Sequence, residues 1–216
     1  MTDTHEELVR KLAHTQPDWP NVLARIKPED IKHWRQGIRK GNDHIISGRV
    51  GEFHLRESLE RIAKTTPHIT LNPVRDGMLA GPYVFCDNGQ LYVRNGGLNR
   101  AEYDAIALVE GVPTVFEIKN RICHTIEESF FSDENIERIM KPLQVLYNTD
   151  KTAFVCICPV DKLSQVNQRF IAKGGMIVPF YTNPITFRQD VIYRVSKHLP
   201  ELQFTNATAR MRAVAV

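Results

Sequence analysis

Two carboxylates and a lysine stand where they could do chemistry together. Asp104 lies in the apolar run 101–109, and Glu117 and Lys119 close the apolar run 113–119. Carboxylate oxygens are the ligands that hard divalent cations prefer, and a neighbouring lysine can orient a water, deprotonate it as the free amine, or stabilise a phosphorane as the ammonium. These residue types therefore point to metal-assisted hydrolysis, provided that the fold brings them together.

The two runs are separated by Glu110-Gly111, which predicts a β-hairpin with a two-residue turn. In that register Val109 pairs with Val112, and Asp104 falls opposite Glu117. Opposed side chains have Cβ atoms about 4.5 to 5.5 Å apart, so the two charges would repel by roughly 3 kcal/mol at an effective dielectric near 20. A bound Mg²⁺ or Mn²⁺ would relieve this repulsion.

The same register sets Glu102 opposite Lys119 and places all four side chains on one face of the sheet. The alternative is a solvent-facing strand pair in which Glu102 and Lys119 form an ordinary ion pair worth under about 1 kcal/mol. That alternative leaves the pairing of Asp104 with Glu117 unexplained.

Glu52 is a further candidate ligand. It lies in the predicted helix 43–64, on the same stripe as the apolar residues Leu55, Leu59 and Ile62. A carboxylate on a core-facing stripe is costly to bury unless something neutralises it. A metal shared with Asp104 and Glu117 would do so.

The remaining pattern predicts an α/β fold, with a mixed sheet flanked by helices on both faces. We expect a helical N-terminal extension over 1–41, a core over 42–200 and a tail without periodicity over 201–216, with 16–20 as a helix break. The expected helices are 3–14, 28–40, 43–64, 133–148, 162–173 and 186–198, and the expected strands are 68–74, 82–86, 90–95, 101–109, 113–119, 152–158 and 176–181.

The order Asp104, twelve residues, then Glu117-Ile118-Lys119, with Glu52 in the preceding helix, resembles the PD-(D/E)XK nuclease superfamily. The segments 48–52 and 116–121 resemble its Holliday-junction-resolvase-like branch. The resemblance covers about residues 44–160. It implies a restriction-endonuclease-like fold and Mg²⁺- or Mn²⁺-dependent hydrolysis of DNA, with Asp104 and Glu117 as metal ligands, Lys119 as catalytic lysine and a homodimer as the assembly.

Two features depart from that pattern or extend it. Tyr103 stands where the family name has proline. Gln144-Val145-Leu146-Tyr147 resembles the Gln-x-x-Tyr motif of the recombination-exonuclease branch, which makes Gln144 a candidate catalytic residue, with packing as the alternative. We expect no iron–sulfur cluster, because the four cysteines lack the spacing of that branch, and we expect Cys156 and Cys158 to be buried as small hydrophobic residues.

Net charge is +3, a mild excess that tolerates a polyanionic partner. Basic residues gather in the second predicted helix and at the start of the third, and we expect them to contact nucleic-acid phosphates unless they only form a solvated helix face. They are Lys32, Arg35, Arg39, Lys40 and Arg49. Trp19 and Trp34 are expected to be packing anchors, and His54, His68 and His124 to be structural.

The first residues contain no apolar signal core, and no stretch is apolar enough to span a bilayer, so we expect a cytoplasmic protein. The favoured function is a DNA endonuclease. An exonuclease, an RNA-cleaving enzyme and a catalytically silent DNA-binding or assembly subunit with the same fold are the alternatives.

Overall fold

The computed structural model describes residues 3–40, 42, 44–71, 82–87, 90–119, 128–158, 165–179 and 184–202. The helices are α1 (Asp3–His14), α2 (Trp19–Leu23), α3 (Pro28–Arg39), α4 (His44–Thr65), α6 (Asp133–Tyr147), α7 (Gln165–Ala172) and α8 (Pro184–His198). The strands are β1 (Ile69–Leu71), β2 (Tyr83–Asp87), β3 (Gln90–Asn95), β4 (Leu98–Tyr103), β5 (Ala105–Val109), β6 (Val112–Ile118), β7 (Ala153–Cys158) and β8 (Met176–Pro179).

The main sheet has five strands in the order β1-β5-β6-β7-β8. Strands β1, β5 and β6 pair antiparallel, whereas β6, β7 and β8 run parallel. Glu110 and Gly111 both have positive φ, as a two-residue hairpin turn of the twisted type requires, and Val109 pairs with Val112. The prediction of an α/β fold with a mixed sheet is confirmed, and so is the register of the hairpin.

A second sheet of three antiparallel strands, β2-β3-β4, stands beside the main one. The single strand predicted over 101–109 is wrong, because the chain bends at Asp104 and divides there into β4 and β5. Glu102 consequently belongs to the second sheet and pairs with Tyr92. Its predicted position opposite Lys119 is also wrong, since the bend takes it out of the β5–β6 ladder.

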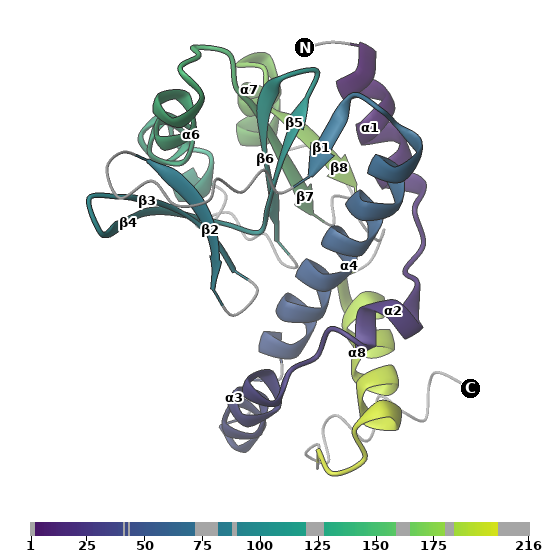
Figure 1. The fold of residues 1–216 in the computed structure, drawn as a ribbon. Coiled ribbons are helices and arrows are strands. Elements are labelled where there is room, and N and C mark those ends of the chain that lie inside the picture. Colours follow the sequence, from purple (N-terminus) through teal and green to yellow (C-terminus); the bar gives the residue numbers. More distant parts are fainter. Residues whose placement is uncertain are drawn as a thin grey trace.

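Helices cover both faces of the main sheet (Figure 1). On one face α1 and α4 pack through Leu8, Leu55 and Leu59 against β5, β6, β7 and β8. On the other face α6 and α7 pack through Leu143 and Phe170, and the same apolar cluster includes the inner face of β2-β3-β4. Strand β7 lies between these layers, and its Cys156 and Cys158 are fully buried, as expected for small hydrophobic residues.

The first half of α4 extends beyond the sheet and is surrounded by α2, α3 and α8 (Figure 1). Trp34 is the largest side chain of this third apolar cluster and is 1% exposed, so its predicted role as a packing anchor is confirmed. The break predicted over 16–20 is wrong in part, because Asp18 caps a short helix that starts at Trp19. Proline at position 20 fits the first turn of that helix, where a missing N–H costs nothing.

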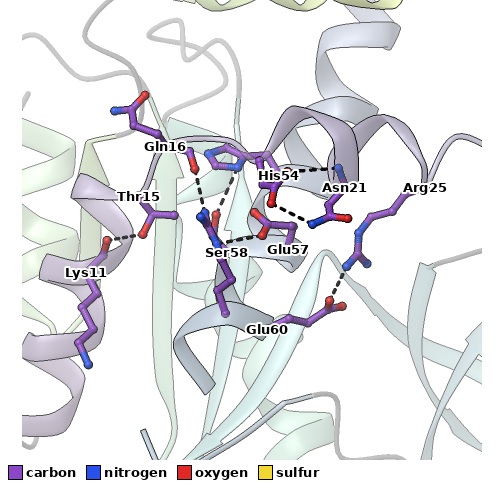
Figure 2. Close-up of polar contacts among 11 residues, drawn as sticks. Lys11, Thr15, Gln16, Asn21, Arg25, His54, Glu57, Ser58 and Glu60 are labelled. Carbon is purple, nitrogen blue, oxygen red and sulfur yellow. Dashed lines mark hydrogen bonds and ion pairs between the residues drawn. The ribbon is translucent and has the colours of Figure 1, made fainter. Parts of the chain in front are cut away.

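Polar contacts attach the N-terminal segment to α4. Arg25, after α2, forms an ion pair with Glu60 of α4 (Figure 2). Within α4 itself, the His54 ring nitrogen Nδ1 lies 3.2 Å from the Ser58 hydroxyl. Arg61 of α4 donates to the backbone oxygen of Gln16 at 2.8 Å. The helical N-terminal region is therefore packed onto the core and covers α4.

No helix in the described residues is both long enough and apolar enough to cross a membrane. Several expectations fall outside the described residues: the ends of the predicted segments 68–74, 162–173 and 176–181, the stretch 120–121, Cys123, His124 and the tail from 203 onward.

Candidate active site

The bend at Asp104 brings its carboxylate onto the neighbouring strand. The amide of Ile118 donates to Asp104 Oδ2 at 2.8 Å, so the acid is held at the end of β6, between Glu117 and the following Lys119 in the sequence. Lys119 Nζ lies 3.1 Å from Glu117 Oε2. The three side chains that were predicted to meet lie close enough for the charge of Asp104 to act on Glu117 and that of Lys119 to act on Asp104, although Asp104 reaches β6 from a bend instead of from a regular cross-strand position.

Arg56 of α4 fixes the bend from the helix side. Its Nε donates to the backbone oxygen of Asp104 at 2.8 Å, and the residue is 8% exposed. Sequence reasoning missed this role. The available signal was that Arg56 follows Glu52 by four residues, which places both on one side of the helix.

Glu52 comes to the same place from the sheet face covered by α4. Arg49 Nη1 donates to Glu52 at 2.5 Å, and Arg49 Nε binds Asp30 of α3 at 3.1 Å. The side chains of Arg49 and Asp30 are only 14% and 13% exposed. Helix α3 can approach this closely because a Cβ on Gly37 would lie 2.1 Å from Ile45 Cδ1.

The Asp30–Arg49–Glu52 bridge borders a pocket of about 380 Å³ between α3 and α4. His33 and Lys27 add basic groups to its wall, and Trp34 adds an apolar one. Glu52 therefore lines a pocket whose opposite wall is formed by charged residues of α3.

Burial raises the pKa of all three carboxylates, and neighbouring negative charge raises the pKa of the two glutamates further. Burial and then the charge of Asp104 raise the pKa of Glu117 to about 8, and the same two causes raise the pKa of Glu52 to about 7 despite Arg49. Burial raises the pKa of Asp104 above its ordinary value, against the amide of Ile118 and the charge of Lys119. Three acids whose charges are mutually unfavourable therefore share one electrostatic environment.

Lys119 keeps its proton in this environment. Burial lowers its pKa, but the carboxylates of Glu117 and Asp104 outweigh burial and raise it above the ordinary value. The ammonium lies 4.6 Å from the ring centroid of Phe130, which stabilises the charge further. At neutral pH this lysine is a hydrogen-bond donor.

The oxygen ligands of this site determine whether it could hold a divalent cation. Hard carboxylate oxygens suit Mg²⁺ or Mn²⁺, which are commonly held by one or two carboxylates with water completing the shell. Within the described part of the chain, no three Asp, Glu, His or Cys side chains are arranged to hold one ion together. Asp104 and Glu117 thus fit as a two-carboxylate site, while Glu52 would have to leave Arg49 to join them.

Gln144 is not brought to the carboxylates. Its Nε2 donates to Thr152 Oγ1 at 3.4 Å, immediately before β7 begins. Glu117 pairs with Cys156 further along β7, about 13 Å away at the rise of a strand. This placement gives Gln144 no contact with the reacting region.

The predicted basic cluster divides in two. Lys32, Arg35, Arg39 and Lys40 are exposed along α3, as phosphate contacts should be. Arg49 is instead enclosed by the two carboxylates and by the ring of Phe53, 4.8 Å from its guanidinium. Of the histidines, His54 is fully buried, and burial lowers its pKa to about 3, as suits a structural group, while His68 is exposed.

Searches with this chain against protein-family models, curated protein sequences and solved structures returned no match. Any functional assignment consequently rests on the residues and geometry described above.

Proposed function

We propose that this protein is a divalent-metal-dependent nuclease that hydrolyses phosphodiester bonds of DNA at Asp104, Glu117 and Lys119, with the restriction-endonuclease-like fold of the PD-(D/E)XK superfamily. The observation that carries the proposal is the meeting of two carboxylates and a protonated lysine at the bend between β4 and β5. The β5–β6 ladder supports it, because this ladder ends at the pair Ala105–Phe116 and leaves Glu117 and Lys119 beyond it, next to the bend.

Asp104 and Glu117 would hold the cation, which would withdraw charge from the scissile phosphate and acidify the attacking water. Lys119 donates a hydrogen bond to a non-bridging phosphate oxygen, because its raised pKa keeps it an ammonium. Arg56 keeps the Asp104 backbone in position, and Asp104 in turn holds the amide of Ile118. We favour endonucleolytic cleavage, as the resemblance implies.

The test is a cleavage assay with labelled single-stranded, duplex and branched DNA, and with RNA, across a titration of Mg²⁺ and Mn²⁺. Glu117→Ala and Lys119→Ala should each lower the rate at least about 100-fold, the scale of one electrostatic group in a transition state. The matched control removes an exposed ion pair on α6, in the double variant Glu137→Ala/Lys141→Ala, and should cleave at the unaltered rate. Thermal unfolding checks that every variant folds.

A silent nucleic-acid-binding subunit is the second candidate, and one observation favours it. Glu52 and Glu117 are already neutralised by Arg49 and Lys119 in the structure, as they would be in a protein that never takes up metal. Binding to DNA without products at any concentration of Mg²⁺ or Mn²⁺ would establish this candidate. Cleavage that survives both Glu117→Ala and Lys119→Ala would remove the proposed site from the enzyme.

A further inference from the structure

One face of the three-stranded sheet packs into the core, and the opposite face carries aromatic and basic side chains. Its inward side chains are buried against α6, which covers that side of the sheet (Figure 1). They are Val84, Leu91, Val93, Ala101 and Tyr103. The alternate positions 83, 85, 92 and 94 on β2 and β3 are half-buried and lie outside this core.

Those alternate positions hold three aromatic rings and an arginine. Phe85 pairs with Tyr92 and Tyr83 pairs with Arg94 across the β2–β3 ladder, so the four side chains share one face. The rings of Phe85 and Tyr92 are stacked with centroids 5.2 Å apart, and the ring of Tyr83 lies 6.0 Å from that of Phe85. The Arg94 guanidinium lies 4.2 Å from the Phe85 centroid. These four residues are called the aromatic face below.

We infer that the aromatic face binds unpaired nucleobases of a single-stranded nucleic acid by stacking, and so delivers a single-stranded segment to the candidate active site. The inference rests on the proposed function for its substrate class. A face of an antiparallel sheet that is not in the core usually carries polar residues, so a row of rings there is unusual. Every base has a π-face that such rings can stack on, whatever its sequence.

Charge and position both favour this occupant. Arg94 belongs to the aromatic face, where its Nε donates to Asn99 Oδ1 at 3.1 Å, and its positive charge suits a strand's phosphates. Exposed Arg100 on β4 forms no hydrogen bond or ion pair with the described residues, so it suits them as well. Tyr92 pairs with Glu102, two residues before Asp104, a separation of about 7 Å along β4. That is about two stacked nucleotides at 3.4 Å each.

Duplex DNA does not fit this face in the same way. Base faces in a duplex are covered by their neighbours in the stack, and only unpaired bases can be splayed onto aromatic side chains. Glu102, on the same side as Tyr92, would repel phosphates, so the strand's backbone should follow Arg94. The aromatic face therefore selects single-stranded regions, whether in a free strand or beside a branch.

The test measures binding of the full chain in EDTA, where cleavage cannot contribute, by fluorescence anisotropy. The probes are a labelled short oligo(dT), an abasic strand of the same length and a duplex of the same length. Oligo(dT) should bind at least about 5-fold tighter than the other two, because one stacked base is worth about 5- to 150-fold in affinity. Tyr92→Ser should weaken oligo(dT) binding by that factor, whereas Tyr92→Trp, which keeps a ring, should not.

Tyr193→Ser is the matched control. Tyr193 is also a half-buried tyrosine beside a cation, with Lys197 4.3 Å from its ring centroid, but it lies on α8 away from the three-stranded sheet. Its variant should bind oligo(dT) unchanged. The inference is overturned if the abasic strand or the duplex binds as tightly as oligo(dT), or if Tyr92→Ser folds and binds normally. The comparison of strands uses the unaltered protein, so it decides the question even if Tyr92→Ser fails to fold.

The two proposals fail separately. Stacking-dependent binding without cleavage in Mg²⁺ or Mn²⁺ would leave the aromatic face established and the nuclease refuted. Cleavage that depends on Glu117 and Lys119, with equal affinity for abasic and normal strands, would refute the aromatic face alone.

Discussion

The carboxylate of Asp104 accepts a hydrogen bond at 2.8 Å from the amide of Ile118, so the residue at which the two sheets separate is tied to the end of the strand that carries Glu117 and leads into Lys119. One carboxylate oxygen is sufficient for this bond. The structural and the chemical duties of Asp104 can therefore be separated by substitution.

Asp104→Asn should keep the fold and lose cleavage. The asparagine side-chain oxygen can accept the same amide hydrogen, and the variant removes a buried charge that raises the pKa of both glutamates, so its midpoint of thermal unfolding should equal or exceed the original. Asp104→Ala leaves the Ile118 amide without this acceptor and should cost about 1 to 3 kcal/mol. Equal destabilisation by the two substitutions, or cleavage by Asp104→Asn, would contradict this division of roles.

Stability should fall as pH rises through the neutral range. Glu117 has a pKa of about 8 in the folded chain against 4.5 ordinarily, and Glu52 has one of about 7, so between those limits the folded state holds protons that the unfolded state has released. The free energy of unfolding then decreases with rising pH. Chemical denaturation from about pH 5 to about pH 8 should show this decrease, and Glu117→Gln should reduce it, whereas the exposed control Glu137→Gln should not.

Divalent cations should reverse that loss. A cation bound only by the folded state stabilises it, and its carboxylate ligands must be deprotonated to bind. Mg²⁺ should therefore raise the midpoint of thermal unfolding more at about pH 8 than at about pH 5. An equal shift at both pH values, or an undiminished shift in Glu117→Gln, would indicate that the ion binds elsewhere.

Arg49 should behave as a charge partner of Glu52 and Asp30. Arg49→Gln leaves two poorly exposed carboxylates without their cation and should destabilise the chain by about 1 to 3 kcal/mol. In the double variant Arg49→Gln/Glu52→Gln much of that loss should be recovered, because no unpaired charge stays at position 52. A double-mutant cycle by chemical denaturation measures the coupling, and simple additivity of the two substitutions would disprove the pairing.

The exposed residues of α3 should set the salt dependence of nucleic-acid binding. Changing Lys32, Arg35, Arg39 and Lys40 to Gln should lower the slope of log K against log salt by about 0.7 for each phosphate of a single strand that the variant no longer neutralises. Fluorescence titrations between low and moderate salt provide the slope. If the variant keeps the original slope, α3 presents a solvated face and does not contact the substrate.

The sequence was sufficient wherever local rules decide structure. A two-residue turn with positive φ at Glu110 and Gly111 sets the β5–β6 register, and alternation of apolar residues identifies the buried strand β7. The expectation that Asp104, Glu117 and Lys119 would lie close together followed from that register, although the bend at Asp104 did not.

Tertiary structure decided what depends on neighbours distant in the chain. The bend at Asp104 exists because Arg56 and Ile118 hold its backbone and side chain, and this bend sends Glu102 into another sheet. Arg49 is enclosed because Asp30 arrives on a separate helix, and no periodicity in either segment encodes that meeting. The chain alone fixed which groups could react, since turn and strand periodicity act over a few residues. Packing over long sequence separations determined which of those groups are exposed, neutralised or kept apart.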